Sequence, residues 1–77
     1  GYFAQHQLDT LRDDQSPVWH IQKLSPEARE QDIRNFLGGF LFAGDMATAP
    51  IAPFSGGEKA QLALAMLVWQ YLQHAQI

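Results

Sequence analysis

The stretch Phe54-Ser55-Gly56-Gly57-Glu58-Lys59 decides how this sequence is organised, because it marks the start of its longest helix. A serine at the N-cap with a glutamate three residues later is the pattern of a capping box, in which each side chain bonds the backbone N–H of the other residue. Ser55 and Glu58 fit that pattern, and the apolar residues after them predict a helix that runs to about residue 74. The glycine pair between them leaves the first turn of this helix without side chains.

A bare first turn exposes backbone amides together with the positive end of the helix dipole. This arrangement suits an anion, especially a phosphate, and the Ser55 hydroxyl can add one more donor. A flexible N-cap with no ligand is an equally good interpretation on the physics alone. The stretch is not a nucleoside-triphosphate P-loop, because the pattern of Gly, four residues and Gly-Lys-Ser/Thr is missing, and Lys59 lies one turn into the helix.

Toward the N-terminus, two further helix starts are predicted where a serine cap stands before a proline, at Ser16-Pro17 and at Ser25-Pro26-Glu27. We expect Gly38-Gly39 to end the second of these helices in the left-handed conformation. Residues 43–53 contain Gly and Pro and predict a loop with at most a short turn of helix. Residues 2–4 are β-prone. The predicted fold class is therefore mainly α, with about three helices plus an N-terminal strand stub.

Composition excludes several kinds of protein. A chain of 77 residues with 47% hydrophobic residues fits one small domain and is not a disordered tail. The net charge of −3 argues against nucleic-acid binding by charge alone, and the lack of cysteine fits a reducing cytoplasm. No apolar run approaches the roughly 18–20 residues that span a bilayer. The three histidines have no shared metal-ligand spacing, and Trp19 and Trp69 are expected in the core.

Two stretches in register resemble the ATP-binding cassette (ABC) family. Residues 54–65 look like the signature loop and helix of that family, and Gly1-Tyr2-Phe3-Ala4-Gln5 looks like its Q-loop. Their separation of 50 residues (55 − 5) suits a helical subdomain, and the resemblance extends to about Gln70. It implies that the chain is the small helical subdomain of an ABC ATPase, a fragment of a larger α/β nucleotide-binding domain. The implied divisions are a Q-loop end at 1–7, the helical subdomain at 8–53, and the signature loop and helix at 54–75.

Details narrow the resemblance to soluble ABC-F proteins. Glu58 followed by Lys59-Ala60 is similar to that branch, and so is Tyr2-Phe3-Ala4-Gln5-His6. ABC-F proteins carry two cassettes on one chain without a membrane domain, and several act on the ribosome. The spacing leaves no room for an inserted arm, which favours the second cassette. Departures are Phe54 in place of the usual Leu, the apolar and stiff stretch 49–53, and the residues after Gln70.

The resemblance implies ATP and Mg²⁺ as cofactors of the parent protein. Ser55, Gly56 and Gly57 would contact the γ-phosphate of ATP held by an opposing cassette, and Glu58 would complete the cap and approach the ribose. Gln5 would act in catalysis and reach Mg²⁺ in the parent. Walker A and Walker B motifs do not occur in the 77 residues. We therefore expect this chain alone to be inactive and to hold no nucleotide.

Implied partners are the remaining nucleotide-binding core, the opposing cassette and, through the parent, the ribosome, all in the cytoplasm. The apolar stretch Ala63 to Trp69 also predicts self-association through the helix at 55–74. Two alternatives stay open. One is a small helical protein-interaction module without nucleotide function, in which Ser-Gly-Gly is only a cap. The other is a fragment of an ABC transporter ATP-binding subunit.

Overall fold

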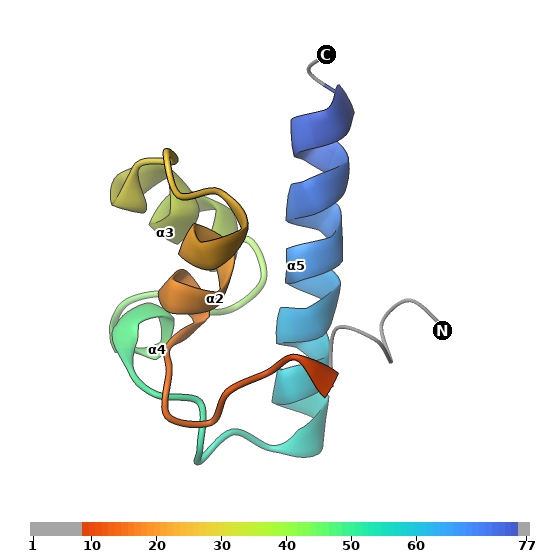
Figure 1. Ribbon diagram of the computed structural model, residues 1–77. Coiled ribbons are helices and arrows are strands. Elements are labelled where there is room, and N and C mark those ends of the chain that lie inside the picture. The colour runs from red at the N-terminus through yellow and green to blue at the C-terminus, as the bar shows by residue number, and fades with distance from the viewer. Residues whose placement is uncertain (1–8, 76–77) are drawn as a thin grey trace.

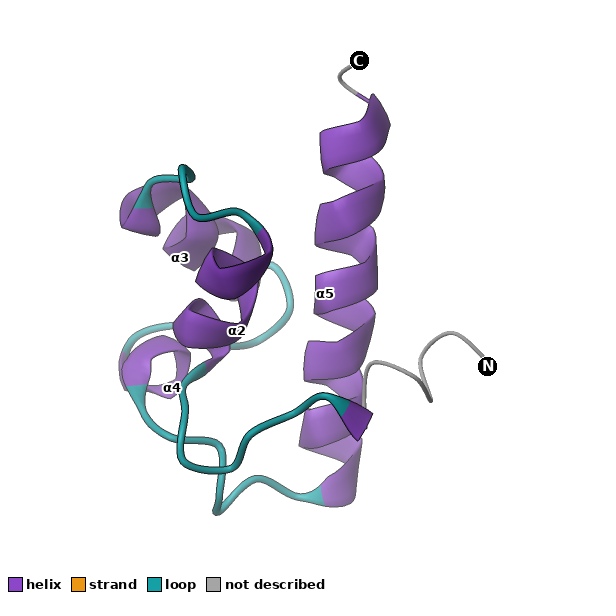
Figure 2. Ribbon diagram, in the orientation of Figure 1, coloured by secondary structure: helices purple, strands orange, loops and turns teal. Residues whose placement is uncertain are grey.

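A computed structural model describes residues 9–75, so Gln5 and the predicted strand stub at 2–4 lie outside the described residues. The helices described are α2 (Pro17–Leu24), α3 (Glu30–Gly38), α4 (Asp45–Thr48) and α5 (Gly56–Ala75). Helix α5 stands along one side of the molecule, with α2, α3 and α4 grouped beside it (Figure 1). Only helices and loops occur between residues 9 and 75 (Figure 2). The mainly α fold is confirmed, and the predicted short turn within 43–53 is α4.

Helix α2 begins where its cap predicts. The Ser16 hydroxyl accepts a hydrogen bond from the Trp19 N–H at 3.1 Å, and Pro17 occupies the first turn, where its missing N–H costs nothing. The helix ends at Leu24, and the N–H of its C-cap Ser25 donates to the carbonyl of Ile21 at 3.1 Å. The local sequence therefore sets where this helix begins, while burial of Val18 and Ile21 in the core stabilises it.

The second helix starts later than Ser25-Pro26-Glu27 predicts. Helix α3 begins at Glu30, with Arg29 as an N-cap that makes no side-chain hydrogen bond. The Ser25 hydroxyl instead accepts from the indole N–H of Trp69 at 2.8 Å, so it does not cap a helix. The side-chain amide of Gln22 holds the intervening turn by donating to the carbonyls of Ser25, Pro26 and Ala28.

The end of α3 also differs from its prediction. Gly39 keeps a right-handed conformation with φ −68°, and Leu41 takes the left-handed one with φ 73°. The Leu41 N–H donates to the Gly38 carbonyl and the Phe42 N–H to the Leu37 carbonyl, which is the pairing of a Schellman motif. The turn falls beyond the glycines because Phe42, 1% exposed, must enter the core there.

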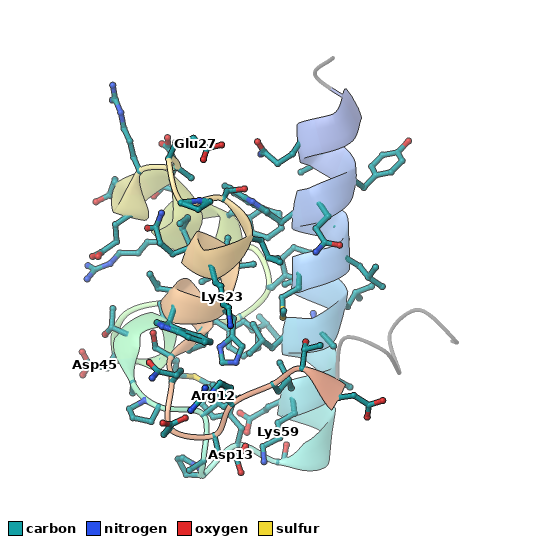
Figure 3. The ribbon with its side chains drawn as sticks, viewed as in Figure 1. Arg12, Asp13, Lys23, Glu27, Asp45 and Lys59 are labelled. Atoms are coloured by element: carbon teal, nitrogen blue, oxygen red, sulfur yellow. The ribbon has the colours of Figure 1, made fainter. Side chains whose placement is uncertain are left out.

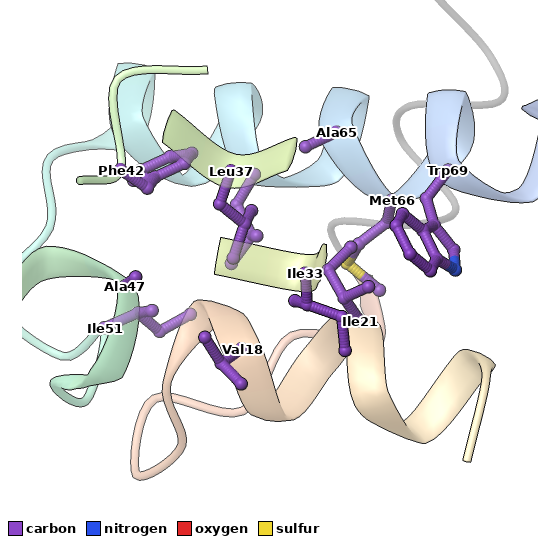
Figure 4. Packing of buried hydrophobic residues seen from close by; sticks show 11 residues of the cluster. Val18, Ile21, Ile33, Leu37, Phe42, Ala47, Ile51, Ala65, Met66 and Trp69 are labelled. Carbon is purple, nitrogen blue, oxygen red and sulfur yellow. The ribbon is translucent and has the colours of Figure 1, made fainter. Parts of the chain in front are cut away.

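One core joins all four helices (Figure 4). Trp69 of α5 is buried as predicted, whereas Trp19 of α2 is only half-buried. The Trp69 ring packs edge-on against Phe36 of α3, with the ring centres 5.2 Å apart. The inner face of α5 is therefore fixed against its neighbours by buried side chains. The buried cluster consists of Val18, Ile21, Ile33, Leu37, Phe42, Ala47, Ile51, Leu62, Ala65, Met66 and Trp69.

Candidate functional site

The predicted capping box is present at the start of α5. The Ser55 N–H donates to Glu58 Oε1 at 2.9 Å, and the Glu58 N–H donates to Ser55 Oγ at 3.2 Å. The first helical hydrogen bond runs from the Lys59 N–H to the Ser55 carbonyl at 3.0 Å. Because Ser55 Oγ acts as the acceptor in this box, the box leaves its own hydrogen available for donation.

Gly56 and Gly57 are exposed in the first turn between these two residues. Among the hydrogen bonds within residues 9–75, none engages either N–H. A Cβ on Gly56 would meet nothing within 4 Å, and one on Gly57 would meet only Ser55 Oγ at 3.9 Å. Neither glycine has a positive φ. The fold therefore requires glycine at neither position, although glycine in a helix costs about 1 kcal/mol relative to alanine.

A surface pocket of about 350 Å³ opens beside this turn. Its apolar wall contains Leu41, which is 79% exposed. The sequence predicts the polar side of the pocket but not its apolar wall, because nothing in the local pattern marks Leu41 as the left-handed residue that turns the chain here. The pocket is lined by Phe40, Leu41, Phe42 and Met46 on one side and by Ser55, Gly57, Glu58 and Gln61 on the other.

The Lys59 side chain forms an ion pair with Asp13. Its Nζ lies 3.2 Å from Asp13 Oδ1, and the two residues meet beside the start of α5 (Figure 3). From the sequence, Asp13 is predicted only to belong to a polar loop. Its pairing with Lys59 is not predicted, because the two residues are 46 positions apart (59 − 13) and no spacing rule connects them.

His20 is a buried polar group of α2 that makes two hydrogen bonds. Its Nδ1 lies 2.6 Å from the Ser16 carbonyl, and its Nε2 accepts from the Arg12 N–H at 2.9 Å. Burial lowers the pKa of His20 below its usual value. Within the described residues, no group of three or more His, Cys, Asp or Glu is placed to hold a metal ion. Gln5, the predicted Mg²⁺-facing residue, lies outside those residues.

None of the helices in residues 9–75 is long and apolar enough to cross a membrane. The chain matches no protein-family model, and it matches no solved structure.

Curated proteins provide the comparison. The chain is 61% identical over 70 residues to the "Probable ATP-binding protein YheS" of Haemophilus influenzae, which covers 91% of this chain and 11% of that protein. It is 57% identical over 70 residues to the protein of the same name from Escherichia coli K12, with the same coverage of 91% and 11%. It is 34% identical over 67 residues to "ATP-binding cassette sub-family F member 3" of Pongo abelii, covering 87% and 9%. The chain thus spans about a tenth of the length of these relatives (11%, 11% and 9%). On these matches, the chain belongs to the ABC-F group of ATP-binding cassette proteins.

Proposed function

We propose that this chain supplies the signature turn of an ABC-F ATPase, in which Ser55-Gly56-Gly57-Glu58 contacts the γ-phosphate of ATP held by an opposing cassette. The observation that carries this proposal is the pair of glycines in the first turn of α5. They favour the helix less than alanine would, the fold does not need them, and they are exposed, with N–H groups that have no partner within residues 9–75. A ligand that approaches the backbone closely accounts for such a pair.

The proposed turn offers three donors to a phosphate. Two are the N–H groups of Gly56 and Gly57, and the third is the Ser55 hydroxyl, whose oxygen already accepts from Glu58. The positive end of the α5 dipole adds to their attraction for an anion. Glu58 uses Oε1 for the capping box, so its second oxygen is left to accept from a ribose hydroxyl. In this proposal the other cassette provides the remaining phosphate contacts, and Gln5 faces Mg²⁺ in its own cassette.

The parent in this proposal is a cytoplasmic protein with two cassettes, of which this chain belongs to the second, and it works on the ribosome. The support is the identity of 57–61% to proteins named as ATP-binding and the more distant match to a sub-family F member. These matches favour an ABC-F parent over an ABC transporter subunit.

The test uses a hybrid in which this chain replaces the matched stretch of E. coli YheS, with ATP hydrolysis as the readout. We expect Ser55→Arg to lower kcat by roughly 100-fold, because a bulky cation fills the space in which the phosphate donors converge. Gln31→Arg, on the exposed face of α3, is the matched control and leaves hydrolysis unchanged. Circular dichroism checks that both variants fold. A folded Ser55→Arg variant with unreduced hydrolysis would instead favour the interaction-module alternative.

A further inference from the structure

The segment at residues 13–15 contacts the chain at two places, one before and one after the bare turn of Ser55, Gly56 and Gly57. Four residues before Ser55, the Ile51 N–H donates to the Gln15 carbonyl at 3.1 Å. Four residues after Ser55, the Lys59 ammonium pairs with Asp13 at 3.2 Å. We call these four residues, Asp13, Gln15, Ile51 and Lys59, the brace. The brace holds the turn from both of its ends against the segment at 13–15.

The segment at 13–15 is itself held in place. The Arg12 N–H donates to His20 Nε2 at 2.9 Å, and the Gln15 N–H donates to the Arg12 carbonyl at 3.0 Å. Asp13 therefore lies between residues that are bonded to α2 and to the loop before α5. Since the backbone at Asp13 is already ordered, pairing it with Lys59 costs less conformational entropy than pairing two free side chains.

The pair between Asp13 and Lys59 differs from the other ion pairs of residues 9–75. Arg34 and Glu30 pair within one turn of α3, and Arg12 pairs with Asp14 two positions away. These local pairs cannot fix one part of the molecule to another. The Asp13–Lys59 pair joins segments that are distant in the chain, and the Lys59 side chain is 27% exposed, which makes it the most buried member of the three pairs.

The bare turn depends on such outside support. Gly56 and Gly57 have no side chains that could pack against the core, and Ser55 is exposed. The direction in which their N–H groups point is therefore set by the residues that flank them. Ile51 is fully buried at 0% exposure and anchors the chain before the turn, while Lys59 connects the first turn of α5 to Asp13.

We propose that Asp13 and Lys59 are positioning residues that orient the donors of Ser55, Gly56 and Gly57 toward the phosphate. This inference rests on the proposed function of the turn. Neither residue needs to touch the nucleotide. Because ATP is held by the opposing cassette in that proposal, loss of the pair lowers kcat and leaves KM nearly unchanged.

The first arm of the test uses the chain of 77 residues and needs no nucleotide. NMR follows the amide chemical shifts of Gly56 and Gly57 in Asp13→Lys, in Lys59→Asp and in the double variant with both changes. We expect each single change to shift these amide signals, and the double variant, which reverses the charges of the pair, to restore them. The matched control exchanges the local pair, with Glu30→Arg and Arg34→Glu, and leaves both amides unchanged.

The second arm measures ATP hydrolysis by the hybrid with E. coli YheS. Each single change is expected to lower kcat about threefold, the size of an exposed ion pair, and the double variant to recover most of this loss. High salt should reduce the difference between the single variants and the unchanged hybrid, because it screens the pair. The Glu30 and Arg34 control keeps the kcat of the unchanged hybrid.

The two arms separate failure of this inference from failure of the proposed function. If Ser55→Arg abolishes hydrolysis while the Asp13 and Lys59 variants alter neither the amides nor kcat, the positioning role is wrong and the proposed function stands. If those variants move the amides but Ser55→Arg keeps full hydrolysis, the proposed function is wrong and the positioning role falls with it. Single variants that lose activity without rescue by the double variant also overturn the positioning role.

Discussion

At the scale of single residues, His20 is held in one protonation state by its two bonds. A neutral imidazole has one donor and one acceptor, and here Nδ1–H donates to the Ser16 carbonyl while Nε2 accepts from the Arg12 N–H. Burial is the largest cause that lowers the pKa of His20, and the nearby charges of Lys23 and Arg12 act in the same direction. The hydrogen bond to the Ser16 carbonyl, which is the second-largest cause, and the Asp14 carboxylate act in the opposite direction, and each raises the pKa by less than burial lowers it. The neutral form is therefore the one that the fold stabilises.

This predicts a loss of stability in mild acid. The unfolded chain protonates His20 at its ordinary pKa of 6.5, whereas the folded chain protonates it only at a lower pH. The unfolded state therefore binds more protons as the pH falls below 6.5, and the free energy of unfolding decreases until the folded-state pKa is passed. Urea unfolding of the chain at about pH 7.5 and about pH 5, followed by circular dichroism, measures the decrease.

The control for this prediction is His20→Gln, whose amide can donate and accept but does not titrate. We expect a smaller difference between the two pH values in this variant. An equal decrease in both proteins would show that other groups cause the pH dependence.

At the scale of the element, the first turn of α5 predicts opposite effects of one substitution on stability and on activity. Gly56→Ala adds a methyl group into open space and a better helix former, so it should raise the free energy of unfolding by at most about 1 kcal/mol, the value for a helix interior. If the turn contacts the phosphate as proposed, the same methyl group in the hybrid lies where the phosphate approaches the backbone, so ATP hydrolysis should fall. Thermal unfolding and hydrolysis rates of the same variant measure the two effects.

Gly38→Ala is the matched control, because Gly38 also lies in a helix and a Cβ there meets nothing within 4 Å. It should raise stability by a similar amount and leave hydrolysis unchanged. Unreduced hydrolysis in Gly56→Ala, or an equal loss in Gly38→Ala, would contradict the assignment of the bare turn to a phosphate.

The helices also show how far the sequence predicts this molecule. Ser16 and Ser55 cap their helices as predicted, because each satisfies N–H groups within three residues of itself. Ser25 has the same local pattern but starts no helix, since its hydroxyl accepts from Trp69, 44 positions away. The prediction that Gly38 and Gly39 take the left-handed conformation is wrong for a similar reason. Burial of Phe42 in the core places the turn at Leu41 instead.

The features of the candidate site that are local in sequence were also predictable, whereas those that depend on long-range contacts were not. Its capping box and glycine pair are local, and the sequence predicts both. The brace and the apolar wall of the pocket join segments that only the folded chain brings together, and no local pattern indicates them. The predicted contacts of Gln5 lie outside the described residues and stay predictions.

At the scale of the whole molecule, the outer face of α5 carries exposed apolar side chains. Leu64 is 45% exposed and Tyr71 is 72% exposed, and the next residue, Leu72, is 42% exposed. In the proposed parent this helix lies against the nucleotide-binding core, and the chain alone leaves it uncovered. We therefore expect the isolated chain to self-associate through α5, with a mass in light scattering that rises with concentration.

Leu64→Glu and Tyr71→Glu together should lower that mass to the monomer value, because each places a charge in the apolar contact. Leu41→Glu is the matched control, since Leu41 is 79% exposed but lies outside α5. A mass that stays monomeric at every concentration in the unchanged chain would contradict self-association.

The bond between Trp69 and Ser25 has a consequence for the far end of α5. Shifting the helix by one residue would turn it by about 100° and move it about 1.5 Å along its axis, and either change would break this bond. The bond from Trp69 to Ser25 therefore fixes both the rotation and the axial position of α5. Gly56 lies 13 residues away (69 − 56), which is roughly 20 Å along the axis, so a change in the position of Trp69 would also move the first turn of α5. In the proposed function, the orientation of that turn toward the nucleotide is therefore set in part by an indole about 20 Å away.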